Sequence, residues 1–403
     1  MISVLQALPP FAAVLLLVVT VHELGHFLMA KAMGVSIDQF SIGFGKAILK
    51  WRDKSGVEWR LGWIPLGGFV KFSGDADAAS TLPDASETDR LRRQVAAHDG
   101  AAATDRLYHC KPVWARALVV AAGPAANFLL AAAIFAGLLM ALGETVLPPR
   151  VAQVAAQSTA ERAGLLPGDL IDRLDGRATD SFDDVQRYVR IRAGDPIRFG
   201  VDRAGRSLEL TATPDRRIIR DEITGRALSV GILGFVPAAK PTDFRHVRYG
   251  PVQAVAKGVD RTREVLNTTV FYISRIFRGR ESGDQIGGLM GTAQMSGKLA
   301  KAAAAAAPTF GGAVLNVGLN LLSLAAVISV GIGFMNLLPV PILDGGHLMF
   351  YAYEALARRP LDARVQAVGY RVGLALIVGL MLFATWNDVR HLSLFRTLGA
   401  MFG

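Results

Sequence analysis

Two histidines and a glutamate lie close together near the start of the chain, in the stretch His22-Glu23-Leu24-Gly25-His26. On a helix, His22 and His26 project from one face one turn apart and can bind one metal ion. Glu23 stands where the H-E-x-x-H pattern of metal-dependent peptide hydrolysis has its general base. The competing interpretation is a chance match, because three fixed residues in five recur in many soluble chains.

The surroundings of this motif favour the functional interpretation. Phe11 to Ala32 is an apolar stretch long enough to cross a bilayer as a helix. An ionisable side chain in such a helix costs about 2.5–3.5 kcal/mol on insertion scales, so it indicates a functional site by default. Residues 1–10 contain no lysine or arginine, so we interpret the segment as a retained membrane helix rather than a cleaved signal peptide.

A catalytic zinc site needs a third protein ligand besides two histidines. Near residue 340 an apolar helix is interrupted by prolines and glycines, and there the chain reads NLLPVPILDGG from Asn336 to Gly346. Asp344 would be expensive at membrane depth unless it were paired or bound to a metal. His347 is a rival ligand, but it lies beyond the glycines, at the expected membrane edge. Depth in the membrane therefore favours Asp344.

The composition indicates a membrane protein with a soluble part. Of 403 residues, 51% are hydrophobic and 19% are charged, and the net charge is +10. The basic residues are spread through loops without a nucleic-acid-binding module, so anionic lipid headgroups are the expected counterpart and nucleic acid is not. The single cysteine, Cys110, excludes an internal disulfide and a cysteine-rich zinc site.

Four apolar stretches predict four membrane spans: Phe11 to Ala32, Leu118 to Leu142, Val314 to Leu338, and Gly369 to Thr385 with its flanks. The loops from Lys31 to Arg116 and from Arg358 to Arg371 are rich in lysine and arginine, so the positive-inside rule places them in the cytoplasm. Both termini and the long segment between spans two and three then face outward, although the C-terminal arginines argue mildly against this.

Five further segments lie outside the spans. Ser36 to Phe72 alternates apolar and polar residues between glycines, which predicts short strands and turns forming a hairpin against the membrane. Ser73 to Asp105 has few large apolar residues and reads as a flexible insert. Pro148 to Lys240 predicts a compact β-rich domain with one helix at residues 182–191.

Arg245 to Phe277 has an amphipathic pattern, which predicts a helix lying either on the outer membrane surface or against that domain. Residues 299–307 predict a further helix that leads into span three.

The chain resembles the site-2 protease family of intramembrane zinc metalloproteases, in its bacterial, RseP-like branch. The resemblance is carried by HELGH at 22–26, FSIGFG at 40–45, IPLGGFVK at 64–71, AGPAANF at 122–128 and NLLPVPILDG at 336–345. AGLLPGDLI at 163–171 is similar to a recurrent stretch of PDZ domains. Together these segments extend over most of the chain.

The resemblance implies the roles of further residues. Zn²⁺ would be held by His22, His26 and Asp344, with Glu23 as the catalytic base, and Asn336 would hold the substrate backbone. The glycine-rich hairpin would present the substrate as an extended strand, through residues Gly43, Phe44, Gly45, Gly67 and Gly68. The implied fold is a polytopic α-helical membrane protein with about four transmembrane helices, a membrane-associated β-hairpin region and one extracytoplasmic PDZ-like domain.

The resemblance also implies partners and a location. Substrates would be single-pass membrane proteins, such as anti-sigma factors or signal-peptide remnants, already cut on the outer side by a first protease. The location would be the bacterial cytoplasmic (inner) membrane, with the PDZ-like domain and both termini in the periplasm. The chain departs from the branch in having one PDZ-like domain where RseP has two, and in its insert at 73–105.

Two other functions compete with proteolysis. An inactive membrane scaffold would bind partners through the PDZ-like domain, but would not need polar groups at membrane depth. A metal transporter would need several polar spans, whereas spans two and four offer little beyond Asn127, for which helix packing through Gly123 is the expected role.

The predicted boundaries follow from these patterns. Membrane helices are expected at residues 1–34, 113–147, 311–350 and 364–390, the hairpin region at 35–72, the insert at 73–112, the PDZ-like domain at 148–240, an amphipathic and linker region at 241–310, and a tail at 391–403.

Overall fold

The computed structural model describes residues 4–73, 93, 95–97, 104–220, 227–237, 243–281 and 288–391. Most of the predicted insert and nearly all of the predicted C-terminal tail lie outside these residues. The chain forms two compact units, described separately below. The first comprises Met1–Phe135, Gly258–Leu266 and Gly287–Gly403, and the second comprises Ala136–Lys257 and Asn267–Ile286.

Four long apolar helices run through the chain: α1 (Val4–Ala32), α4 (Val113–Leu142), α9 (Phe310–Asn336) and α11 (Ala363–His391). Within the described residues, these are the four helices long and apolar enough to cross a membrane. They match the four predicted spans in order, and each begins before the apolar run that predicts it. The direction in which they cross stays a prediction.

The predicted third span differs from a single helix over residues 311–350. Helix α9 ends at Asn336, and a new helix, α10 (Asp344–Ala357), begins at Asp344. Pro339 and Pro341 lie between the two helices, and a proline lacks the N–H that an α-helix needs and clashes with the preceding turn. The turn folds back so closely that a Cβ on Gly345 would lie 2.3 Å from the carbonyl oxygen of Leu337. The proline and glycine residues therefore make Asp344 the first residue of a helix.

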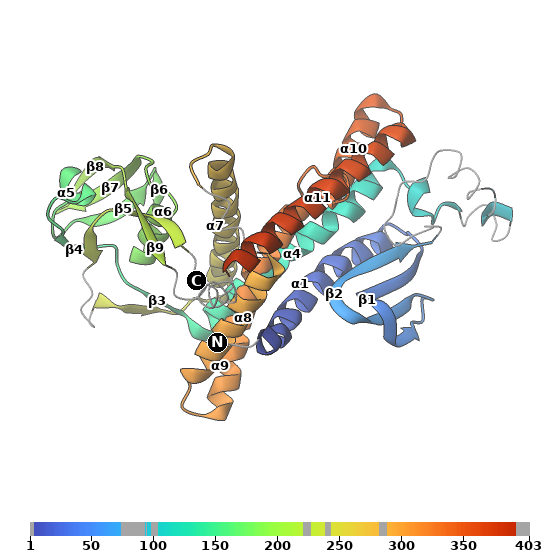
Figure 1. Cartoon of the computed structure of the whole chain (residues 1–403), viewed down its shortest axis with the longest axis horizontal. Coiled ribbons are helices and arrows are strands. Elements are labelled where there is room, and N and C mark those ends of the chain that lie inside the picture. Colours follow the sequence, from blue (N-terminus) through green and yellow to red (C-terminus); the bar gives the residue numbers. More distant parts are fainter. Residues whose placement is uncertain are drawn as a thin grey trace, which may run out of the picture. The chain divides into compact units, whose positions relative to one another are not determined.

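The predicted hairpin is present, with longer strands than expected. β1 (Ile37–Arg52) and β2 (Glu58–Phe72) pair antiparallel, and both lie against α1 (Figure 1). Ile42 pairs with Gly68 on one side and with Leu61 on the other, so this part of β1 is paired at both edges, whereas residues 68–72 of β2 pair with β1 along one edge. The rings of Phe27 and Phe40, 5.4 Å apart, join α1 to the sheet.

The loop of this hairpin is held by one carboxylate. Asp53 accepts hydrogen bonds from the backbone N–H groups of Ser55 and Val57, and from the indole of Trp59 at 3.1 Å. Hydrogen bonds from Ser55 and Trp59 lower the pKa of Asp53 to about 2, because they favour the ionised carboxylate. The loop end of the hairpin exposes apolar side chains, with Ile48 62% and Leu49 57% exposed.

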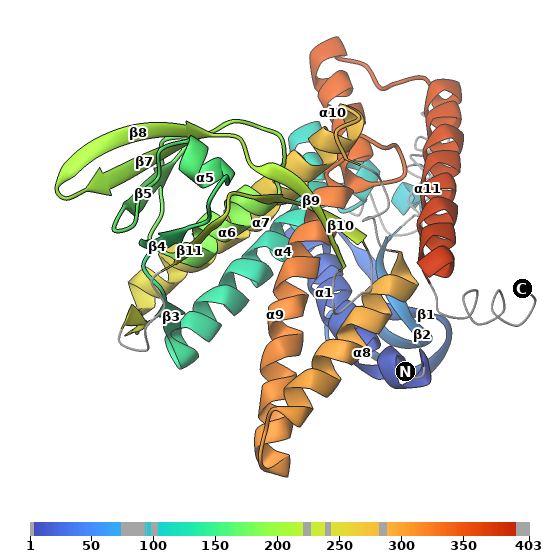
Figure 2. The ribbon, with the colours of Figure 1, turned by 60° about the vertical axis from the view of Figure 1, so that its left-hand side comes forward.

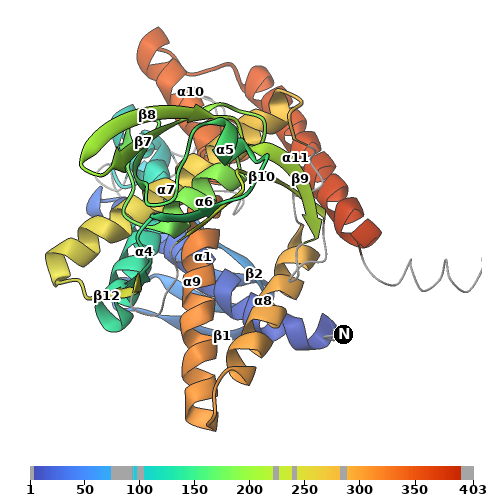
Figure 3. The ribbon, with the colours of Figure 1, turned by 90° about the vertical axis from the view of Figure 1, so that its left-hand side faces the viewer.

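Two more described elements belong to the first unit. Helix α8 (Leu289–Ala305) lies beside α1 and α9 (Figure 3). It begins ten residues before the predicted Ala-rich helix. Its N-terminal amides at Gly288 and Gly291 donate to the carboxylate of Asp388 on α11, at 3.1 and 2.8 Å. A short 3-10 helix, η1 (Tyr108–Cys110), precedes α4.

The second unit contains the predicted β-rich domain (Figure 2). A four-stranded sheet has the order β6-β5-β7-β8, formed by β6 (Arg177–Ala178), β5 (Leu170–Leu174), β7 (Ile197–Arg203) and β8 (Arg206–Ala212). Three separate two-stranded sheets lie in the same unit. They pair β4 (Val151–Val154) with β11 (Phe235–Pro237), β9 (Asp215–Arg220) with β10 (Ala227–Ile232), and β3 (Glu144–Val146) with β12 (Arg245–Val247). Its helices include α5 (Thr159–Arg162) and α6 (Phe182–Arg190).

The core of this unit includes residues of the sheet and of α6. Ile171, Ile197, Phe199 and Val201 point inward from the sheet and are fully buried, and Val185 of α6 packs on them. Short β-like runs in the sequence predict four strands, at residues 151–154, 197–202, 207–213 and 228–233, and these correspond to β4, β7, β8 and β10. The prediction missed the others, because β5 reads as part of a loop and β9 is mostly arginine and isoleucine without clear alternation.

The predicted amphipathic segment 245–277 is a strand followed by a helix. β12 ends at Val247, and α7 runs from Pro251 to Phe277. The guanidinium of Arg275, 2% exposed, bonds to the carboxylates of Asp195 and Glu281 and to the carbonyl of Ala193. The end of α7 is therefore packed on the second unit, whereas Val252 at its start is 84% exposed.

Candidate metal centre

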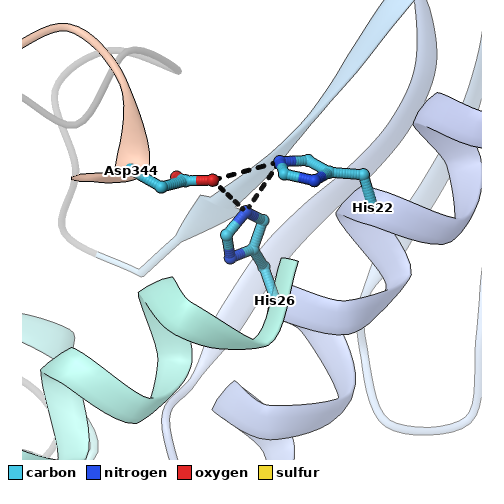
Figure 4. Close-up of side chains that lie close together, drawn as sticks. All are labelled: His22, His26 and Asp344. Carbon is cyan, nitrogen blue, oxygen red and sulfur yellow. Dashed lines mark hydrogen bonds and ion pairs between the residues drawn. The ribbon is translucent and has the colours of Figure 1, made fainter. Parts of the chain in front are cut away.

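Three side chains from two helices meet at one point in the first unit (Figure 4). His22 and His26 project from α1, and Asp344 projects from the first turn of α10. The Nε2 atoms of the two histidines are 3.2 Å apart, and Oδ2 of Asp344 lies 3.2 Å from His22 Nε2 and 3.5 Å from His26 Nε2. Among the described residues, these three are the group of histidine, cysteine and acidic side chains placed to hold a metal ion.

This geometry fits zinc. With metal–ligand bonds of about 2.0–2.1 Å, two ligand atoms of a tetrahedral zinc site lie about 3.3 Å apart, and the three separations here are 3.2, 3.2 and 3.5 Å. Oδ2 of Asp344 is buried and accepts no hydrogen bond within the described part of the chain. A buried carboxylate oxygen without a donor is costly, and a cation between the three atoms would satisfy it.

His347, the rival ligand, lies elsewhere. It sits one turn further along α10, and its Nδ1 is 3.5 Å from the hydroxyl of Tyr370 on α11. The ring of His347 also contacts the rings of Phe350 and Tyr370. The structure brings Asp344, rather than His347, to the two histidines.

One face of α4 supports the two histidines. Nδ1 of His26 donates to the carbonyl oxygen of Val119 at 2.9 Å. One turn later, Gly123 leaves the space that the imidazoles occupy, since a Cβ there would lie 2.2 Å from His26 Nε2 and 2.9 Å from His22 Cε1. Another turn on, the side-chain amide of Asn127 lies 3.3 Å from His22 Nδ1. Val119, Gly123 and Asn127 are spaced by four residues and therefore share one helix face.

Asn336 also reaches this centre. As the last residue of α9, it places its side-chain nitrogen 3.4 Å from His22 Nε2. The sequence prediction paired Asn336 with a substrate beside the metal, and the structure brings it to the ligand triad. The sequence prediction did not place Asn127 at this centre, because its neighbours in the sequence indicated only helix packing.

Comparisons with known proteins agree with this centre. The model of peptidase family M50 matches residues 10–380. The chain belongs to peptidase family M50. Metalloprotease MmpA of Caulobacter vibrioides is 45% identical over the full length of both chains. Chains named as candidate zinc metalloproteases, Atu1380 of Agrobacterium fabrum and R01501 of Rhizobium meliloti, are 44% and 42% identical over 95% and 96% of both chains.

Membership in M50, the site-2 protease family, confirms the resemblance read from the sequence. It also confirms the predicted enzyme class, a zinc-dependent metalloendopeptidase, and zinc as the cofactor. The single PDZ domain and the membrane orientation stay predictions, as do the roles of individual residues.

In this M50 peptidase, Glu23 lies between the triad and the hairpin. It follows His22 on α1, and a Cβ on Gly68 of β2 would lie 3.0 Å from its Cγ. Of the glycines predicted to present substrate, Gly68 is thus the one beside the expected base. Gly67 has a φ of +115° and leaves room for the ring of Phe44, while Gly43 faces the carbonyl of Ile64. Gly45, with a φ of +85°, also lies near Ile64.

A buried polar network anchors the helix that carries Asp344. Arg116 of α4 bonds to Glu354 of α10 at 2.7 Å, and its guanidinium lies over the ring of Tyr351, 4.9 Å from the centroid. The hydroxyls of Tyr351 and Tyr108 are 2.9 Å apart. These contacts fix α10 against α4 and η1, so the position of Asp344 relative to His22 and His26 is set by more than the turn before it.

Proposed function

We propose that this M50 peptidase hydrolyses peptide bonds within membrane-spanning segments, with zinc held by His22, His26 and Asp344. The carrying observation is that these three side chains converge beside α1, a helix apolar enough to lie in a bilayer, which itself carries His22 and His26. Zinc held there supplies Lewis-acid polarisation of water and of the scissile carbonyl. The competing functions are less well supported: a scaffold has no need of this triad, and a transporter would need a polar pathway through several helices.

Glu23 is the general base in this proposal. It lies next to His22 in the chain and against Gly68 of β2, so a substrate running along the hairpin would pass its carboxylate. Glu23 takes a proton from the attacking water and passes it to the leaving amine, which is the role of the glutamate in H-E-x-x-H sites. Asn336 holds the substrate backbone, which its place 3.4 Å from His22 Nε2 supports.

The substrate has to unwind before it is cut, because a helical peptide bond is shielded by its own hydrogen bonds. The hairpin offers a strand for β-addition, which replaces the lost helix bonds with inter-strand bonds. A glycine at 68 supports this proposal, since the absence of a side chain lets the backbone of β2 approach Glu23 closely. Gly43, Phe44, Gly45 and Gly67 belong to the same hairpin, and Gly43 and Gly45 lie where the pairing of the strands shifts register.

The proposed substrates are single-pass membrane proteins, such as anti-sigma factors or signal-peptide remnants, after a first cut on the outer side. The proposed location is the bacterial inner membrane, with the PDZ-like domain and both termini in the periplasm, which the lysine and arginine content of the other loops supports. The PDZ-like domain would select trimmed substrates either by excluding large ones or by binding their new C-terminus.

The test is the Glu23→Gln variant, purified and incubated with a reporter membrane helix. We expect cleavage to be abolished while zinc content stays at the wild-type level, because the amide cannot accept the proton. Glu209→Gln makes the same chemical change on β8, at a side chain 67% exposed, and should cleave normally. Cleavage by Glu23→Gln would refute the assignment, and an inactive wild type that still binds the reporter would favour the scaffold.

A further inference from the structure

Each ligand histidine has a second ring nitrogen, and the group that faces it decides which nitrogen carries the proton. A histidine that binds a metal through Nε2 needs that atom unprotonated, so Nδ1 must carry the hydrogen and donate it to an acceptor. His26 meets this condition, because its Nδ1 lies 2.9 Å from the carbonyl oxygen of Val119, which can only accept.

His22 faces a group that can do either. Its Nδ1 lies 3.3 Å from Nδ2 of Asn127, an amide nitrogen that can only donate. A donor at this position requires an unprotonated Nδ1, whereas a His22 bound to zinc through Nε2 carries its hydrogen on Nδ1. Nε2 itself faces both Oδ2 of Asp344 at 3.2 Å and the amide nitrogen of Asn336 at 3.4 Å. The orientation shown for the Asn127 amide therefore does not suit a zinc-bound His22.

The other end of the same amide is the acceptor that a ligand histidine requires. Oδ1 of Asn127 is buried and accepts no hydrogen bond in the described part of the chain, and the residue is 0% exposed. A half-turn of the amide about its χ2 angle exchanges the two atoms and places Oδ1 against Nδ1 of His22. The exchange leaves the helix and the imidazole where they are.

We propose that Asn127 is the positioning residue that sets the tautomer of His22 for zinc binding. With Oδ1 towards the ring, it accepts the Nδ1 hydrogen and leaves Nε2 free to bind the metal. This inference rests on the proposed function, in that it takes His22 as a zinc ligand. It extends that function, because α4 then supplies both hydrogen-bond acceptors that orient the two ligand histidines. These acceptors are the carbonyl oxygen of Val119 for His26 and the side-chain oxygen of Asn127 for His22.

The surroundings hold Asn127 in place and leave only the orientation of its amide to be set. Its backbone carbonyl accepts a hydrogen bond from the hydroxyl of Ser329 on α9, at 2.8 Å. On the same helix, a Cβ on Gly333 would lie 3.2 Å from Cβ of Asn127, so glycine allows α9 to pack directly on this residue. Helix α9 therefore holds the backbone and the Cβ of Asn127 in place.

Two substitutions separate the acceptor from the packing. Asn127→Asp keeps an oxygen on either side of Cγ and should accept from Nδ1 without a half-turn. Asn127→Leu keeps a similar volume and removes the acceptor. Zinc affinity of the full-length protein is measured by competition with a chromophoric chelator. We expect Asn127→Leu to bind zinc about 10–100-fold more weakly, as on loss of other second-sphere partners of metal-bound histidines, and Asn127→Asp to bind like the wild type.

The outcomes distinguish this inference from the proposed function. Unchanged affinity in Asn127→Leu, or the same loss in both variants, overturns the role of Asn127. Wild-type affinity in His22→Phe overturns the zinc site itself. A measurement on the unmutated protein covers the case in which a variant fails to fold: ¹⁵N NMR of the histidine-labelled, zinc-loaded chain should show two metal-bound histidines with protonated Nδ1, and only one would refute the inference.

Discussion

Adding a single methyl group at Gly123 should remove zinc from the enzyme. In Gly123→Ala the new Cβ would lie 2.2 Å from Nε2 of His26, whereas ordinary contacts begin at 3.4 Å. The imidazole would have to retreat by about 1.2 Å, and a metal site tolerates ligand displacements of about 0.2 Å. His26 would thus be lost as a ligand, so zinc affinity should fall by more than the about 10–100-fold expected for a second-sphere change.

The assay is zinc affinity of the purified, full-length chain, together with cleavage of a reporter membrane helix. Gly137→Ala is the matched control, since Gly137 is on the same helix and a Cβ there has nothing within 4 Å. Both variants gain helix propensity, about 1 kcal/mol relative to glycine, so thermal unfolding of the zinc-free proteins should show them both folded. Wild-type zinc affinity in Gly123→Ala would refute the geometry of the site.

The remaining predictions concern stability. Arg116→Ala should lower the free energy of unfolding by about 3 kcal/mol, because it leaves Glu354 without its partner in a largely buried pair; denaturant unfolding that is unchanged would mean that the pair does not anchor α10. In the second unit, burial alone would raise the pKa of Asp169, but two bonds from Arg203 and one from a backbone N–H lower it. Asp169 therefore stabilises the fold above its unfolded pKa of about 3.9, and this contribution is lost as the pH falls through the lower folded value. The difference in Tm between the wild type and Asp169→Asn should be largest near neutral pH and shrink below about pH 4; a difference independent of pH would contradict this account.

Local patterns were enough to predict most of the chain. The four apolar helices, the hairpin and the main strands of the second unit each have a periodicity or a turn signal that is complete within about 20 residues. Asp344 could be singled out because prolines and glycines interrupt the apolar run there. The sequence did not reveal that a new helix begins at Asp344, since an apolar run with two prolines fits either a kinked helix or two helices.

The support for the ligands could not be predicted in this way, because it depends on how two helices are rotated against each other. Gly25 lies within the motif that carries the histidines, and nothing in the motif itself explains why that position is a glycine. In the structure, a Cβ on Gly25 would lie 2.3 Å from the carbonyl oxygen of Ala122 and 2.8 Å from Cβ of Ala126. The missing side chain lets α1 approach the backbone of α4 at this turn, and Gly123 then leaves room for both imidazoles. One close helix crossing therefore places the acceptors of α4 beside the ring nitrogens that do not face the metal. The two glycines act as a pair: one brings the helices together, and the other leaves room for the histidines.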